Sequence, residues 1–136
     1  MADKLNFELV SPERALASEA CDMVVMPGEE GDLGVLVEHS PMVVLLRPGV
    51  VAVHEGDRLA KRFFVAGGFA EVRPEGCMVL TEEGMDLAEV ARDAATERLD
   101  TAQRDLAELG EEGPVKERAE RSVRVAEALV EAVEAG

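Results

Sequence analysis

The 136-residue chain has no tryptophan or tyrosine, and it contains only two histidines and two cysteines. Groups that transfer protons or form covalent intermediates in enzymes are therefore scarce. His39 and His54 have no evident set of catalytic partners, and the two cysteines have no CxxC spacing or local ligand pair that would nucleate a zinc site. Cys21 and Cys77 lie in apolar, strand-like stretches, so we expect buried free thiols. The composition argues against an enzyme.

Basic residues are also few, with 14 Lys and Arg against 29 Asp and Glu, a formal net charge of -15. Such a surface repels a phosphate backbone, so nucleic acid is a poor partner, and the same repulsion disfavours an anionic membrane surface. The longest apolar runs, such as Met42–Leu46, are far shorter than the roughly 20 residues of a membrane helix. The N-terminal stretch has no pattern of a secretory signal. We therefore expect a cytoplasmic protein without direct membrane insertion.

Short apolar or alternating segments fill the sequence from Leu5 to about Thr81, and glycine, proline and aspartate separate them. Strands that recur about every eight to twelve residues, with no helical pattern between them, indicate an antiparallel sandwich or barrel. The spacing predicts about eight to ten strands. We expect residues 1–84 to form this β-sandwich domain.

A different periodicity governs the last third of the chain. Apolar residues recur at intervals of three and four over 87–109 and again over 115–133, as on one face of a helix. The segment 110–114, GEEGP, supplies a terminating glycine and a proline suited to the first turn of a second helix. Residues 85–136 are therefore predicted to form a two-helix antiparallel hairpin, and the fold class is α+β.

Two further features concern where the hairpin begins and what it packs on. Asp86 and Glu89 resemble a capping box, which predicts that the first helix begins near Asp86. The apolar stripe is mostly alanine and valine, which remove little area from water, so the hairpin needs a surface to pack on. That surface is either the sandwich or another protein.

The segment 28–41, GEEGDLGVLVEHSP, combines three glycines with four carboxylates. A phosphate cradle needs backbone N–H groups and commonly a lysine, whereas this loop offers only negative charge. The carboxylates also lack the alternating ligand spacing of a calcium loop. We expect a solvent-facing contact loop.

The stretch 31–51, GDLGVLVEHSPMVVLLRPGVV, resembles the epsilon subunit of the bacterial rotary ATP synthase, whose N-terminal domain typically carries G-x-L-G, H-x-P and K/R-P-G motifs. The resemblance continues through 65–84, where a Gly-Gly turn precedes an E-V strand. The family fold is a β-sandwich of about ten strands followed by two helices. This is the fold that periodicity predicts independently.

The resemblance implies a non-catalytic subunit of the central stalk that turns with the gamma subunit and braces it on the ring of c subunits, at the cytoplasmic face of the bacterial inner membrane. It implies a peripheral protein that couples proton flow to ATP synthesis. The implied contacts with the c ring are Glu30, Gly31 and Asp32, and those with gamma are His39, Ser40, Pro41 and Met42.

The C-terminal half departs from the family pattern. Some members bind ATP through the motif Leu/Ile-Asp-x-x-Arg-Ala. This chain keeps the arginine as Arg92 but has Glu89 at the position of the aspartate. Asp93 follows the arginine and would place a further negative charge near the phosphates. We therefore expect no cofactor and no tight regulatory ATP. In inhibitory relatives, basic residues of the second helix meet an acidic segment of the catalytic beta subunit. Here every charged residue after Arg124 is acidic, so inhibition of hydrolysis is expected to be weak.

A protein of another class also fits part of this pattern. A free-standing adaptor or chaperone-like module, whose hairpin clamps a client, explains the thin apolar stripe equally well. This alternative does not explain why the three motifs of the first half occur together.

Overall fold

The computed structural model describes residues 4–109 and 113–135. The chain divides into two compact units, with the boundary between Ala88 and Glu89. The first unit contains the strands and the second contains the helices.

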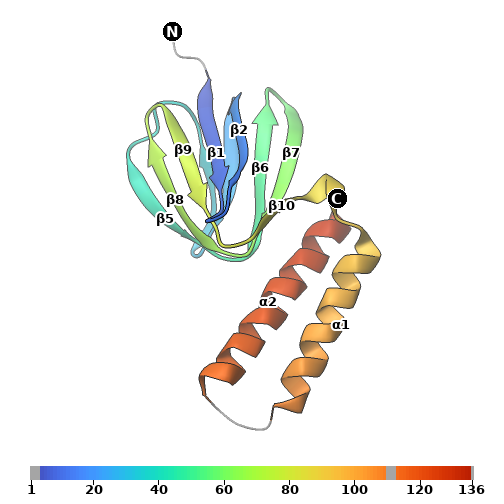
Figure 1. The fold of residues 1–136 in the computed structure, drawn as a ribbon. Coiled ribbons are helices and arrows are strands. Elements are labelled where there is room, and N and C mark those ends of the chain that lie inside the picture. Colours follow the sequence, from blue (N-terminus) through green and yellow to red (C-terminus); the bar gives the residue numbers. More distant parts are fainter. Residues whose placement is uncertain (1–3, 110–112, 136) are drawn as a thin grey trace. The chain divides into compact units, whose positions relative to one another are not determined.

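Ten strands make up the first unit within the described part of the chain, as the turn spacing predicts (Figure 1). They are β1 (Leu5–Val10), β2 (Ala15–Cys21), β3 (Met23–Gly28), β4 (Gly31–Val35), β5 (Met42–Leu46), β6 (Gly49–Glu55), β7 (Arg58–Val65), β8 (Gly68–Arg73), β9 (Gly76–Leu80) and β10 (Gly84–Asp86). The hydrogen-bonded order is β10-β7-β6-β3-β5-β8-β9-β1-β2, with β4 paired to β3. All pairs are antiparallel except β1 with β9, which is parallel.

The core of the sandwich follows from the alternation of apolar residues along the strands. On β1, Leu5, Phe7 and Leu9 are fully buried, while the residues between them face outward. The ring of Phe7 packs against that of Phe63 on β7, with centroids 6.0 Å apart. This contact joins strands far apart in the sequence and closes the sandwich over one apolar interior.

Both cysteines are buried free thiols, as the sequence predicts. Burial raises the pKa of Cys21 to about 11 and that of Cys77 to about 12. The thiolate is the nucleophile and the metal ligand, so these two groups are inert at neutral pH. They serve as small apolar side chains of the core.

The second unit is a helical hairpin of α1 (Arg92–Glu108) and α2 (Pro114–Ala135), which lie side by side (Figure 1). The second helix begins at the proline, as predicted, because a missing N–H costs nothing in the first turn. The predicted turn residues 110–112 lie outside the described residues. The buried side chains of the two helices are mostly small: Ala95, Val125, Ala126, Leu129 and Ala132.

The predicted start of the first helix near Asp86 is wrong. Gly84–Asp86 forms β10 and pairs with Phe63–Val65 of β7, and a 3-10 turn, η1 (Leu87–Glu89), follows before α1 begins at Arg92. Asp86 does act as a cap, since its Oδ1 accepts the N–H of Ala88 at 2.9 Å. Asp86 therefore caps the 3-10 turn, whereas the pairing of β10 with β7 moves the start of the α-helix to Arg92.

Candidate functional site

The acidic turn is the two-residue loop Glu29–Glu30, which joins β3 to β4. Gly28 pairs with Gly31 at its base. A Cβ on Gly28 would lie 2.6 Å from the carbonyl oxygen of Gly31, and Gly31 itself has a φ of +140°. Both glycines are therefore required, because one position has no room for a side chain and the other has a backbone conformation that L residues rarely adopt. The turn projects exposed carboxylates from a tight base.

Arg47, in the turn between β5 and β6, fastens this base. Its guanidinium donates through Nη1 to the carbonyl oxygen of Gly28 and through Nη2 to Oδ1 of Asp32, the latter at 2.6 Å. Its backbone N–H donates to the carbonyl oxygen of Pro27 at 2.9 Å, and the N–H of Glu29 donates to that of Leu45 at 2.8 Å. The acidic turn is thus tied at several points to the strand that precedes Arg47.

A groove of about 440 Å³ runs between the acidic turn and β5. One side is formed by residues 28–33 and the other by residues 42–45. Three predicted c-ring contacts, Glu30, Gly31 and Asp32, therefore line the same depression as Met42, a predicted gamma contact. We call this depression the acidic groove.

The loop between β4 and β5 carries the other predicted gamma contacts. Glu38 has a φ of 70°, and its N–H donates to the carbonyl oxygen of Pro74 at 2.6 Å, which anchors the loop to the turn between β8 and β9. His39 is half-buried, and its Nδ1 donates to the carbonyl oxygen of Ser40 at 2.8 Å. Ser40, Pro41 and Met42 are exposed. The imidazole braces the loop, and the three residues after it are available for contact.

Strands β5, β8, β9 and β1 are neighbours in the sheet (Figure 1). A row of apolar residues crosses their outer face. Leu45 pairs with Phe69, Phe69 with Leu80, and Leu80 with Val10, so the four side chains lie on one face. Leu45 is 60% exposed and Phe69 is 43% exposed, and Val43 beside them on β5 is 64% exposed. Apolar side chains grouped in this way on one face of a sheet are typical of an interaction surface.

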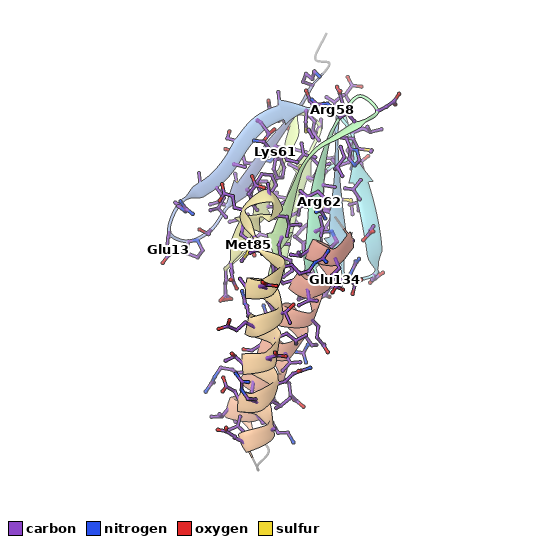
Figure 2. The ribbon with its side chains drawn as sticks, turned by 90° about the vertical axis from the view of Figure 1, so that its right-hand side faces the viewer. Glu13, Arg58, Lys61, Arg62, Met85 and Glu134 are labelled. Atoms are coloured by element: carbon purple, nitrogen blue, oxygen red, sulfur yellow. The ribbon has the colours of Figure 1, made fainter. Side chains whose placement is uncertain are left out.

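Cations gather elsewhere on the first unit. Arg58, Lys61 and Arg62 follow one another along β7 (Figure 2), three of the seven basic residues in positions 1–84. Lys61 forms an ion pair of 3.4 Å with Glu19 on β2. The sandwich therefore shows a negative groove and a separate positive strand, although its net charge is negative.

The predicted nucleotide-binding residues Glu89 and Arg92 lie at the entrance to the hairpin, the first in η1 and the second at the start of α1. Both are exposed, and Asp93 follows in the first turn. A cleft of about 480 Å³ lies between the helices, but neither residue lines it.

Among residues 4–109 and 113–135, no helix has the length and apolarity needed to cross a membrane. In the same ranges no group of three or more His, Cys, Asp or Glu side chains is placed to hold a metal ion.

Sequence reasoning missed the role of Arg47 and the exposure of Val43, Leu45 and Phe69. The signal for the apolar row was present in MVVLL, which is apolar at every position. A strand with one solvated face alternates between apolar and polar residues. A strand that is apolar at every position in an antiparallel sandwich therefore indicates that both of its faces are covered, one by the core and the other by a further surface. Arg47 stood in a recognised turn motif, but its bond to Asp32 depends on the pairing of strands.

The chain therefore combines a β-sandwich, which carries the acidic groove and the apolar row, with a C-terminal helical hairpin. Residues 4–86 match the family model described as ATP synthase, Delta/Epsilon chain, beta-sandwich domain. The ATP synthase epsilon chain of Rhodospirillum rubrum is 45% identical over 132 residues, covering 97% of this chain and 98% of the relative. That of Paramagnetospirillum magneticum is 45% identical, covering 98% of this chain and 99% of the relative.

Solved structures show the same fold. A chain in the Euglena gracilis mitochondrial ATP synthase, in a structure of its OSCP/F1/c-ring part, matches with a TM-score of 0.80 at 22% identity, covering 96% of this chain and 82% of that one. A chain in the central stalk/c-ring structure of the Tetrahymena thermophila mitochondrial ATP synthase matches with a TM-score of 0.62 at 15% identity, covering 93% and 96%. The protein belongs to the delta/epsilon chain family of ATP synthases.

Proposed function

We propose that the chain is a non-catalytic subunit of the central stalk of a proton-translocating ATP synthase, where it braces gamma on the c ring. The relatives that match it over nearly their whole length are named ATP synthase epsilon chain. The observation that carries the proposal is the acidic groove, which Met42, a predicted gamma contact, lines together with the predicted c-ring contacts 30–32. A groove of this kind allows one edge of the sandwich to contact both partners.

The gamma subunit is the partner proposed for the apolar row and the adjoining loop. Leu45, Phe69 and Val43 expose apolar surface on strands whose other face is the buried core. Covering this surface supplies the hydrophobic part of an interface, and the exposed Ser40–Met42 segment extends it. The protein is thereby held to the rotor through its sandwich.

The ring of c subunits is the partner proposed for the acidic turn. Glu29 and Glu30 project carboxylates from a rigid two-residue loop, which suits basic and polar groups on the opposing surface. Contact of this kind sets the orientation of two proteins and their association rate more than it sets their affinity. The sandwich is then peripheral, at the cytoplasmic face of the inner membrane, with no segment inserted.

The hairpin is proposed to regulate hydrolysis only weakly. On α2, Glu127, Glu131 and Glu134 are spaced by four and three residues and so share one face of the helix. A carboxylate row repels the acidic segment of a catalytic beta subunit that a basic helix would attract. Tight ATP binding is not expected either, because Glu89 and Asp93 place two negative charges around Arg92.

Co-elution of the full chain with the gamma subunit of the same organism tests this function. We expect a stable complex of the two, and then capture of that complex by the detergent-solubilised c ring. Failure of the chain to bind gamma would remove the rotor assignment and favour the free-standing adaptor. Binding to gamma without any gain in ring capture would remove only the c-ring contact.

A further inference from the structure

We propose that Arg47 is a positioning residue for the acidic turn, and that it withdraws Asp32 from the contact and leaves Glu30 as the carboxylate that meets a cationic group of the partner. This inference rests on the proposed contact with the c ring. It divides the predicted contact residues into an anchor, Asp32, and a recognition group, Glu30.

The guanidinium is placed to hold both ends of the turn at once. It donates to the carbonyl oxygen of Gly28, the last residue of β3, and to the carboxylate of Asp32, the second residue of β4. These acceptors lie on either side of the Glu29–Glu30 loop. A planar fork of donors can bond two acceptors in a fixed relation, so the mouth of the turn cannot open without breaking one of the bonds.

The arginine itself starts from a fixed backbone. Its N–H donates to the carbonyl oxygen of Pro27, directly before Gly28. Two residues later the chain passes so close to β3 that a Cβ on Gly49 would lie 2.9 Å from the Cβ of Pro27. The clamp and the turn therefore form one packed unit.

The charge of Asp32 is already matched within the protein. Of the three carboxylates in residues 29–32, only that of Asp32 has an ion-pair partner among the described residues, the Arg47 guanidinium at 2.6 Å. Glu29 and Glu30 are exposed at the tip. A cation of the partner is therefore attracted to the tip, where the negative charge is uncompensated.

The pair contributes little to folding stability, since the side chains of Arg47 and Asp32 are 44% and 62% exposed. Its effect falls on binding instead. A loop that is already ordered loses less conformational freedom when the partner docks, and ordering costs of the usual size correspond to about a three- to tenfold change in affinity.

The sign of the effect of one substitution separates positioning from a purely electrostatic influence of Arg47. Arg47→Gln removes a positive charge beside an acidic surface, which by electrostatics alone tightens binding to a cationic partner. If the arginine positions the turn, the same substitution weakens binding, because the loop becomes free to move. The two accounts therefore predict opposite results.

The experiment measures the affinity of the full chain, bound to gamma, for the solubilised c ring. We expect Arg47→Gln and Asp32→Asn each to weaken ring binding about three- to tenfold, and the double variant to be no weaker than either, since both remove the same clamp. Arg47→Lys keeps the charge but loses the fork, so it should recover little of the affinity. Lys61→Gln is the matched control, a half-exposed cation paired with Glu19, and should have no effect.

Two further readouts exclude a general structural defect. The melting temperature and the affinity for gamma should stay unchanged in Arg47→Gln. Amide hydrogen exchange should become faster at Glu29, whose N–H donates to the carbonyl oxygen of Leu45 at 2.8 Å. Exchange that stays slow in this variant would contradict the clamp.

Glu30→Gln separates the inference from the function on which it rests. Loss of ring binding in Glu30→Gln together with unchanged or tighter binding in Arg47→Gln would overturn the positioning role and keep the c-ring contact. Ring binding that none of the variants changes would overturn the contact itself. Additive losses in the double variant would make Asp32 a direct contact and refute its role as an anchor.

Discussion

Replacing Leu45 by serine is expected to weaken the complex with gamma by about five- to thirtyfold. The side chain lies in the middle of β5, next to Phe69 on β8, and is 60% exposed in the free chain. Serine removes the apolar group without adding bulk. The change therefore acts on the surface that a partner covers.

The magnitude follows from the exposed fraction. Full burial of a leucine side chain contributes about 1.5 to 3 kcal/mol. Because 60% of Leu45 remains to be covered, docking gains about 1 to 2 kcal/mol from this residue, which corresponds to the five- to thirtyfold change in Kd. The part already packed on Phe69 costs the folded chain at most about 1 kcal/mol, so the variant should still fold.

Titration of gamma with the full chain measures the change, and Leu59→Ser is the matched control. Leu59 is 47% exposed on β7 and lies outside the apolar row. It should lose similar folding stability and no affinity. Equal affinities for the two variants would refute the assignment of the apolar row to gamma.

Three further predictions concern the turn, the thiols and the hairpin. Gly28→Ala places a methyl group 2.6 Å from the Gly31 oxygen and should destabilise the sandwich by about 1 to 3 kcal/mol in urea denaturation; an unchanged midpoint would refute the close packing of the turn. The pKa values of Cys21 and Cys77 are raised to about 11 and 12, so the unfolded chain loses these protons at a lower pH than the folded chain does. The stability contribution of the two thiols is therefore full below about pH 9 and should be lost as the pH rises through 11 and 12. A variant with both cysteines replaced by alanine should lack this fall in stability with pH. Removal of residues 89–136, which keeps β10 and the buried Leu87, should leave gamma binding intact and change ATP hydrolysis little, and a several-fold rise in hydrolysis would contradict weak regulation.

The acidic turn shows how far sequence reasoning reaches into the site. Its glycines, its carboxylates and its place in a contact loop could all be inferred from 14 consecutive residues. The roles within it could not, because Asp32 and Arg47 are 15 positions apart and meet only after β3 has paired with β4 and reached β5. A motif shows which residue types are present, and strand register decides which of them bond to one another.

The sequence by itself determined the elements: alternation and turn residues are local properties, so they predicted about eight to ten strands and then two helices. Tertiary structure decided the rest. It paired β1 with β9 in parallel, converted Gly84–Asp86 into an edge strand, and turned Leu45 and Phe69 outward although both are strongly apolar. The physical reason is that periodicity gives a strand two faces, whereas long-range pairing decides which face the core covers and which is left for a partner.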